Sequence, residues 1–200
     1  FHETQMDEAA RQRKALSADL RNAIDRGNLA LPYPVQNSVQ TGEISGYEAL
    51  LRWQHPERGM VPPAQFIPLA EECGAIIEIG EWVMRTACSE ALAWPVPHRI
   101  AVNVSAVQLT QGDFAHTVQS ILVETGFPPN RLEIEITESA IIADKVRALH
   151  VLRRIRALGV AIAIDDFGAG YSSRETLRTF PFDKIKLGWS FTHGLKHSVQ

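Results

Sequence analysis

Residues 131–170, RLEIEITESAIIADKVRALHVLRRIRALGVAIAIDDFGAG, decide the fold class through their pattern of residue types. Apolar and acidic residues alternate over 131–137, which predicts a strand. An apolar stripe over 145–158, followed by Gly159, predicts a helix with a glycine at its C-terminal end. The continuous apolar run over 160–164 predicts a second strand that is covered on both faces. A strand, a helix and a strand in this order indicate a parallel sheet with helices packed on it.

The same rhythm extends outward in both directions from this stretch. It predicts helices over 63–73, 79–94, 113–125 and 173–179, and strands over 29–35, 44–53, 99–105 and 184–187. A turn at Thr41 and Gly42 joins the first two strands, so we expect the first to run antiparallel to the second. Six strands with intervening helices predict an α/β fold of the barrel type. Because a closed barrel of this kind has eight strands, about two βα units are expected to be missing.

The composition narrows the classes of protein and partner. The chain has 200 residues, of which 45% are hydrophobic, enough for one substantial core. A formal net charge of -3 gives no electrostatic case for binding a nucleic-acid polymer. No apolar run approaches the roughly 18 residues of a membrane span. Cys73 and Cys88 lack a metal-binding spacing and are interpreted as reduced thiols of a cytoplasmic protein, with a disulfide as the alternative.

The N-terminal region predicts a connection to another domain. The chain begins at Phe1, which suggests a piece of a longer polypeptide, and residues 3–26 predict a helix that precedes the first strand. We therefore divide the chain into a linker helix at 1–27, from an upstream domain, and a barrel domain at 28–200. A helix packed on the barrel remains the alternative.

Polar residues lie where the predicted strands end. They are Glu48, Asn103, Glu135, Asp165, Asp166 and Lys186. In βα barrels the carboxyl ends of the strands meet at one mouth, where the active sites of such barrels are found. Several oxygen ligands with one lysine are typical of a site for a hard divalent metal ion.

Alternation of side chains is the main argument for Glu135. Glu133 and Glu135 share one face of their strand, and the apolar residues take the other. Inside a barrel a carboxylate needs a cation or a hydrogen-bond partner. We therefore interpret Glu135 as a metal ligand; a solvated edge strand is the alternative.

Asp165 and Asp166 are adjacent carboxylates that repel each other unless cations neutralise them. Two metal ions bridged by one of them would suit attack on a phosphodiester. The alternative is an Asp-rich turn before Gly168.

Three further residues fit this chemistry. Asn103 offers a carbonyl oxygen to a metal ion, unless it is a turn residue or a helix cap. Lys186 lies on the face opposite Ile185 and would stabilise charge on a phosphoryl oxygen, whereas Lys184 is expected to be a surface lysine. Arg52 comes four residues after Glu48, so we place both on one face of the second strand, where a guanidinium suits a phosphate.

Together these motifs resemble the EAL family of cyclic-di-GMP phosphodiesterases. The resemblance covers about residues 14–187, with EALLRW at 48–53, HPERGMVPPAQFIPLAEE at 55–72, NVS at 103–105, EITE at 135–138, DDFG at 165–168 and PFDKIK at 181–186. It implies a modified TIM-type barrel with an antiparallel first strand, which hydrolyses cyclic di-GMP to linear pGpG with Mg²⁺ or Mn²⁺. FHETQMDEAARQRK, before the match, resembles the tail of a GGDEF domain and implies a GGDEF-like domain upstream.

The resemblance also implies roles for individual residues. One metal ion would be held by Glu48, Asn103, Glu135 and Asp165, and a second by Asp165 and Asp166. Lys186 would position the attacking water beside Glu48. Leu50 and Arg52 would contact the dinucleotide. Glu138 would stabilise the loop after Asp166, through which the resemblance implies a homodimer.

The chain departs from the family pattern at several positions. Pro34 stands where the family has a nucleotide-contacting glutamine, Gly188 replaces an aspartate near the metal ions, and Ser173-Arg174-Glu175 replaces a serine-leucine-serine loop. The later AEGVE-type motif, whose glutamate completes the second metal site, is missing. Two functions therefore stay open: a phosphodiesterase domain, with weak or no turnover expected from this chain, and a non-catalytic EAL-like module that binds cyclic di-GMP or a protein partner.

Overall fold

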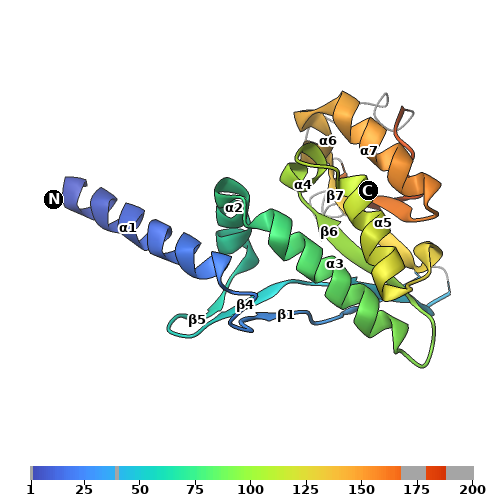
Figure 1. The fold of residues 1–200 in the computed structure, drawn as a ribbon, viewed down its shortest axis with the longest axis horizontal. Helices are drawn as coiled ribbons and strands as arrows, with labels where there is room; N and C mark the ends of the chain where they lie inside the picture. Colours follow the sequence, from blue (N-terminus) through green and yellow to red (C-terminus); the bar gives the residue numbers. More distant parts are fainter. Residues whose placement is uncertain (1, 39–40, 168–178, 188–200) are drawn as a thin grey trace, which may run out of the picture.

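A six-stranded mixed sheet forms the centre of the molecule (Figure 1). The computed structural model describes residues 2–38, 41–167 and 179–187. In spatial order the strands are β2 (Val35–Asn37), β3 (Ile44–Ala49), β6 (Arg99–Val104), β7 (Leu132–Thr137), β8 (Ala161–Phe167) and β9 (Lys184–Leu187). β2 runs antiparallel to β3, and every other neighbouring pair is parallel. The predicted barrel-type sheet with an antiparallel first strand is confirmed.

The two outer strands of this sheet approach each other through their side chains. Gln36 Oε1 of β2 accepts a hydrogen bond of 3.3 Å from Lys184 Nζ of β9, although four strands separate them in the sheet order. In a flat sheet strands so placed would lie about 24 Å apart, at roughly 4.8 Å per strand. The sheet must therefore curl, as the wall of a barrel does.

A second sheet was not predicted. β1 (Leu29–Ala30), β4 (Arg52–His55) and β5 (Gly59–Val61) form three antiparallel strands in the order β1-β4-β5. The predicted strands 29–35 and 44–53 are thus each divided between two sheets.

The division occurs at two prolines, which have no backbone N–H to donate. Pro32 and Pro34 only accept, from the N–H groups of Leu50 and Glu48 at 3.1 Å each. The prediction that Arg52 shares a strand face with Glu48 is therefore wrong, because Arg52 begins β4 in the other sheet.

Helices contact the strands and one another along the chain (Figure 1). They are α2 (Pro63–Cys73), α3 (Ile76–Leu92), α4 (Ala106–Thr110), α5 (Phe114–Thr125), α6 (Glu138–Ala143) and α7 (Lys145–Ala157), with a 3₁₀ turn at Pro129–Arg131. Four of them match predicted helices to within three residues at each end. Apart from Thr179, the helix expected over 173–179 lies outside the described residues.

The short helices α4 and α6 were missed because each begins directly where a strand ends. Ser105 caps α4 and Thr137 caps α6 through their hydroxyl oxygens, so the chain turns from strand to helix without a connecting loop. Asp113, expected inside the first turn of α5, is likewise its N-cap and accepts from the His116 N–H.

The N-terminal helix α1 (His2–Arg21) extends from the body of the molecule (Figure 1). The C-terminal part of α1 contacts α2. Leu16 and Leu20 are buried there, and Arg13 makes two bonds of 2.5 and 2.6 Å to the Glu72 carboxylate. The helix ends at Arg21, earlier than the expected residue 26, and a turn leads to Gly27. Part of α1 thus packs on the domain; its linker role stays a prediction.

The described residues also bear on the expectations for the cysteines and for membrane-spanning helices. Both cysteines are free, and burial raises the pKa of the Cys88 thiol to about 12. None of the helices in the described ranges has the length and apolar character needed to cross a membrane.

Gly80 provides a test of the packing between α3 and α4. A Cβ there would lie 2.1 Å from Gln108 Nε2, and Gln108 is the buried member of the capping box with Ser105. Gly80→Ala is expected to lower the free energy of unfolding by about 1–3 kcal/mol through overpacking. Substituting alanine for glycine in an exposed helix would instead raise it by about 1 kcal/mol.

Denaturant unfolding of both Gly80→Ala and Ser89→Ala measures this effect. Ser89 is an exposed residue of the same helix, so its substitution should change stability by no more than about 0.5 kcal/mol. A stabilised Gly80→Ala protein would contradict the close contact with Gln108.

Candidate active site

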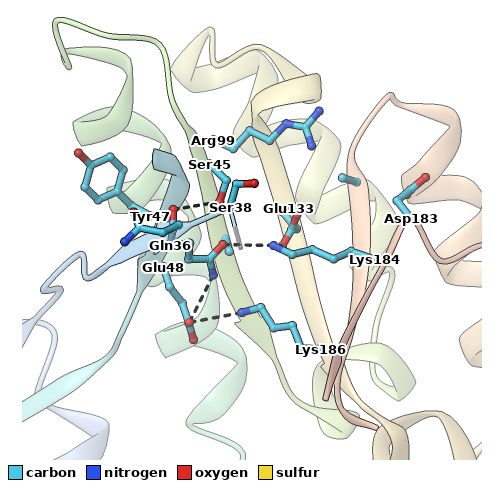
Figure 2. Close-up of a pocket in the computed structure, with 13 residues that line it drawn as sticks. Gln36, Ser38, Ser45, Tyr47, Glu48, Arg99, Glu133, Asp183, Lys184 and Lys186 are labelled. Carbon is cyan, nitrogen blue, oxygen red and sulfur yellow. Dashed lines mark hydrogen bonds and ion pairs between the residues drawn. The ribbon is translucent and has the colours of Figure 1, made fainter. Parts of the chain in front are cut away.

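One face of the curled sheet carries a row of charged and amide side chains, several of them labelled in Figure 2. The residues on this face are Gln36, Glu48, Asn103, Glu133, Glu135, Asp165, Lys184 and Lys186. Strand side chains alternate faces, so residues two apart, such as Lys184 and Lys186, point the same way. The predicted convergence of side chains from separate strands is confirmed for Glu48, Asn103, Glu135 and Lys186.

Lys186 lies between two carboxylates from different strands. Its Nζ is 3.4 Å from Glu48 Oε2 and forms an ion pair with Glu135 Oε1. Asn103 Nδ2 donates a 2.9 Å hydrogen bond to Glu48 Oε1. Four side chains from β3, β6, β7 and β9 thus meet in one cluster of opposite charges.

Glu135 is the most deeply buried member of this cluster, with 1% of the residue exposed. Burial raises the pKa of its carboxyl to about 7, and the charge of Glu48 adds to the rise. The hydrogen bonds from Lys186 and Gln36 and the Lys186 charge oppose it without cancelling it. Glu135 Oε2 is buried and has no hydrogen-bond partner among the residues that the structure describes, so one oxygen of this carboxylate is uncompensated there.

Lys186 remains a cation in this setting. Its burial alone would lower the pKa, but the hydrogen bond to Glu135 and the charges of Glu135, Glu48 and Asp165 raise it overall. A protonated ammonium can orient a water molecule or neutralise a phosphoryl oxygen, which is the role that the sequence predicts for Lys186.

A second set of partners lies beside this cluster, on the same face. Lys184 Nζ is 3.0 Å from Glu133 Oε1, and Glu133 is 5% exposed. Gln36 links the two sets: its Nε2 lies 3.3 Å from Glu135 Oε1 and 3.5 Å from Glu48 Oε2. Lys184, expected to be a surface lysine, keeps 40% of its side chain exposed, but it shares the face of Lys186 and pairs with Glu133. Gln36 was not predicted as a site residue. It is two residues from Pro34, and residues two apart on a strand share a face, so this spacing could have placed Gln36 on the charged face.

The structure places four other predicted site residues, which are Leu50, Arg52, Glu138 and Asp165. Leu50 lies between β3 and β4, and Arg52 Nη1 donates to the Leu51 carbonyl at 2.9 Å. Glu138 begins α6 and is 5% exposed. Asp165 lies on β8 opposite Thr137 and contributes to the electrostatics of Lys186.

Several predictions fall where the structure gives less detail. Asp166 belongs to β8, but its side chain is outside the described part of the chain. Gly188 and the 173–175 loop also lie outside the described residues. Their predicted roles are untested.

A cavity of about 600 Å³ opens beside the charged face (Figure 2). Among its lining residues are Gln36, Glu48, Glu133, Lys184 and Lys186. Its volume lies within the usual range for small-molecule sites, roughly 300–1,000 Å³, but Asn103, Glu135 and Asp165 are not among its lining residues.

The residues on this face fit a divalent cation. Among the side chains that the structure describes, no three carboxylate, imidazole or thiol groups are arranged as a metal cage. The buried Glu135 Oε2, for which no hydrogen-bond partner is found among the described residues, nevertheless forms a set of hard oxygen ligands with Glu48 and the amide of Asn103. Lys186 supplies the positive charge between these carboxylates in the structure.

A comparison with protein families bears directly on this site. The family model described as "EAL domain" matches residues 17–200. The chain belongs to the EAL domain family. The match includes the strands that carry Glu48, Asn103, Glu135 and Lys186, so it agrees with the sequence-based resemblance.

Known proteins similar to this EAL domain include two larger bacterial proteins. An uncharacterized signaling protein of Caulobacter vibrioides is 50% identical over 98% of this chain, which spans 24% of that protein. The bifunctional diguanylate cyclase/cyclic di-GMP phosphodiesterase MucR of Pseudomonas aeruginosa is 39% identical over 98% of this chain and 29% of its own length. The chain therefore spans about a quarter of these relatives.

The fold is also similar to that of a solved phosphodiesterase. The structure of the MucR phosphodiesterase in complex with c-di-GMP superposes with a TM-score of 0.85 at 39% identity. The alignment covers 92% of this chain and 76% of that one. This similarity confirms the TIM-like barrel type of the fold.

The pKa of Glu135 predicts how stability depends on pH without metal ions. Its value of about 7 in the folded state lies above the ordinary 4.5, so the folded protein holds this proton more tightly than the unfolded chain. The resulting stabilisation is complete below about pH 4.5 and is lost as the pH rises through about 7. In a chelator, the thermal midpoint of Glu135→Gln should therefore fall less than that of the unsubstituted chain between about pH 5 and about pH 8.

Glu124→Gln is the matched control, since Glu124 is exposed on α5. It should retain the pH dependence of the unsubstituted chain. Identical pH profiles for all three proteins would show that Glu135 ionises normally in the folded state.

Proposed function

We propose that this EAL domain binds cyclic di-GMP and hydrolyses one of its phosphodiester bonds to give linear pGpG. The observation that carries the proposal is the meeting of Glu48, Glu135, Asn103 and Lys186 on one face of the curled sheet. The similarity to the MucR phosphodiesterase, solved as a c-di-GMP complex, supports the same substrate.

Mg²⁺ or Mn²⁺ is the proposed cofactor. Glu48, Asn103, Glu135 and Asp165 would hold one ion, and Asp165 with Asp166 a second. When bound, such ions activate water and withdraw charge from a phosphoryl oxygen. The uncompensated oxygen of Glu135 supports this assignment, because a buried carboxylate is stabilised by a cation.

The protein's own side chains supply orientation and charge. Lys186 keeps its proton on Nζ and holds the attacking water and a phosphoryl oxygen in place. Arg52 presents a guanidinium that can bind a phosphate through two parallel hydrogen bonds. Leu50 gives an apolar contact to the dinucleotide. Glu138, buried at the start of α6, would stabilise the loop after Asp166.

The assembly of the domain is also a proposal. The loop after Asp166 would form a homodimer contact, and residues 1–27 would connect an upstream GGDEF-like domain to the barrel at 28–200. The curated description of MucR as a bifunctional cyclase and phosphodiesterase supports this arrangement. Two free cysteines are consistent with a reducing, cytoplasmic location.

Pro34 favours a second candidate function, that of a non-catalytic binding module. Its carbonyl accepts from the Glu48 N–H, so it stands beside the carboxylate cluster, yet its ring has no polar atom for a nucleotide. A site that lacks this contact could bind cyclic di-GMP or a protein without turning over. The module would then act as a receptor.

Direct detection of pGpG tests the proposal. The purified 200-residue chain is incubated with cyclic di-GMP and Mn²⁺ or Mg²⁺, and the products are separated by chromatography. Any turnover by this chain is expected to be weak, and Glu48→Ala should abolish it, because it removes a proposed cation ligand and the acceptor for Asn103 and Lys186. A chelator should abolish turnover.

Glu124→Ala is the control, an exposed glutamate on α5 whose loss should leave kcat unchanged. Product that persists in a chelator or in Glu48→Ala would overturn the assignment of this site. Binding of cyclic di-GMP in calorimetry without any pGpG would favour the receptor.

A further inference from the structure

Among the described residues, Gln36 joins both sets of charges on the charged face of the curled sheet, which is its inner face (Figure 2). Its Nε2 faces the carboxylates of Glu48 and Glu135, and its Oε1 faces the ammonium of Lys184. A glutamine amide has two N–H donors and one carbonyl acceptor, so both ends are used here.

The charges on either side fix the orientation of this amide. Rotating it by 180° would direct the carbonyl oxygen at two carboxylates and the NH₂ group at an ammonium. Lys184 is itself held by Glu133, which is 5% exposed and 3.0 Å away. The ion pair of Glu133 and Lys184 therefore sets which way Gln36 points.

The local backbone gives Gln36 room to reach across. Its partner on β3 is Gly46, which has no side chain to occupy the inner face at that level. A Cβ on Gly46 would lie 2.9 Å from the Arg99 carbonyl oxygen, so this position has no space for one. The neighbours Val35 and Asn37 are exposed, whereas Gln36 is half-buried.

We propose that Gln36 is a positioning residue for the cation site: it holds the Glu48 and Glu135 carboxylates in the orientation that binds a divalent metal ion. The inference rests on the proposed function only through the presence of that ion. Gln36 binds Glu135 through Oε1, which leaves Oε2, the buried oxygen without a partner, for the metal. Mutation of a residue that hydrogen-bonds to a metal ligand typically lowers metal affinity or activity by about 10- to 100-fold.

The test measures Mn²⁺ binding directly, by calorimetry without nucleotide, in Gln36→Leu and in the unsubstituted chain. The Kd for Mn²⁺ is expected to rise about tenfold or more. In turnover of cyclic di-GMP, kcat should fall by a similar factor while KM changes less than about twofold, since the proposed nucleotide contacts are Leu50 and Arg52. Gln119→Leu, an exposed glutamine on α5, is the control and should match the unsubstituted chain in each measurement.

A second pair of proteins tests the orienting role of Lys184. Glu133→Gln with Lys184→Met removes the ion pair without leaving a buried carboxylate unpaired. Gln36→Leu is then compared in the double variant and in the unsubstituted chain. In the double variant it should raise the logarithm of the Kd for Mn²⁺ by less than half as much. An equal effect in both backgrounds would overturn the proposed role of Lys184.

The outcomes separate this inference from the proposed function. Mn²⁺ binding that weakens in Gln36→Leu, with no hydrolysis by any variant, would support Gln36 and refute the phosphodiesterase. A Kd within about twofold of the unsubstituted chain would refute Gln36 whatever the turnover. An unsubstituted chain that binds no Mn²⁺ would refute it too. If Gln36→Leu does not fold, Gln36→Met, which keeps the chain length without the amide, replaces it.

Discussion

The buried carboxylate of Glu135 is the constraint on which the rest of the site depends. A charge at 1% exposure is costly unless other groups neutralise it, and the rise of its pKa to about 7 reflects that cost. Lys186 and Gln36 bind one oxygen of this group and leave the other without a partner. The surrounding polar side chains can be understood as the means by which the fold keeps this carboxylate inside the sheet and ready for a cation.

The curled sheet brings the required partners together. Glu48 and Glu135 come from strands near one end of the sheet and its middle, while Lys184 and Lys186 come from β9 at the other end. Side-chain contacts of β9 with β2 and β3, at the far end of the sheet, require the sheet to curve. The same curvature therefore produces the barrel-type fold and the charge pairing of its inner face.

Much of this arrangement could be predicted from the sequence because strand periodicity is simple. The alternation around Glu133 and Glu135 places both inside, and Lys186 follows the same rule beside Ile185. Applied consistently, that rule would also have placed Lys184 inside, since it is two residues from Lys186. Lys184 differs from Lys186 in exposure, at 40% against 21% of the side chain, and not in the face of the strand that it occupies.

Other features depend on contacts between distant residues and could not be predicted from local patterns. Nothing near Gln36 in the sequence indicates that Lys184, 148 positions away, will bind its carbonyl. The separation of Arg52 from β3 arises because β4 pairs with β1 and β5, a choice between two possible sheets. α4 and α6 are too short to show a helical period, so their capping residues were the only local signal.

The central proposal is that a divalent cation binds between Glu48 and Glu135, the two carboxylates that Lys186 joins in the structure. A crystal structure of the chain soaked with Mn²⁺, with anomalous scattering recorded at the manganese edge, tests this most directly. The account predicts an anomalous peak within ligand distance of Glu135 Oε2 and Glu48, with Lys186 turned away from one of the two carboxylates. A structure with Mn²⁺ bound elsewhere, and Lys186 still joining both carboxylates, would contradict it.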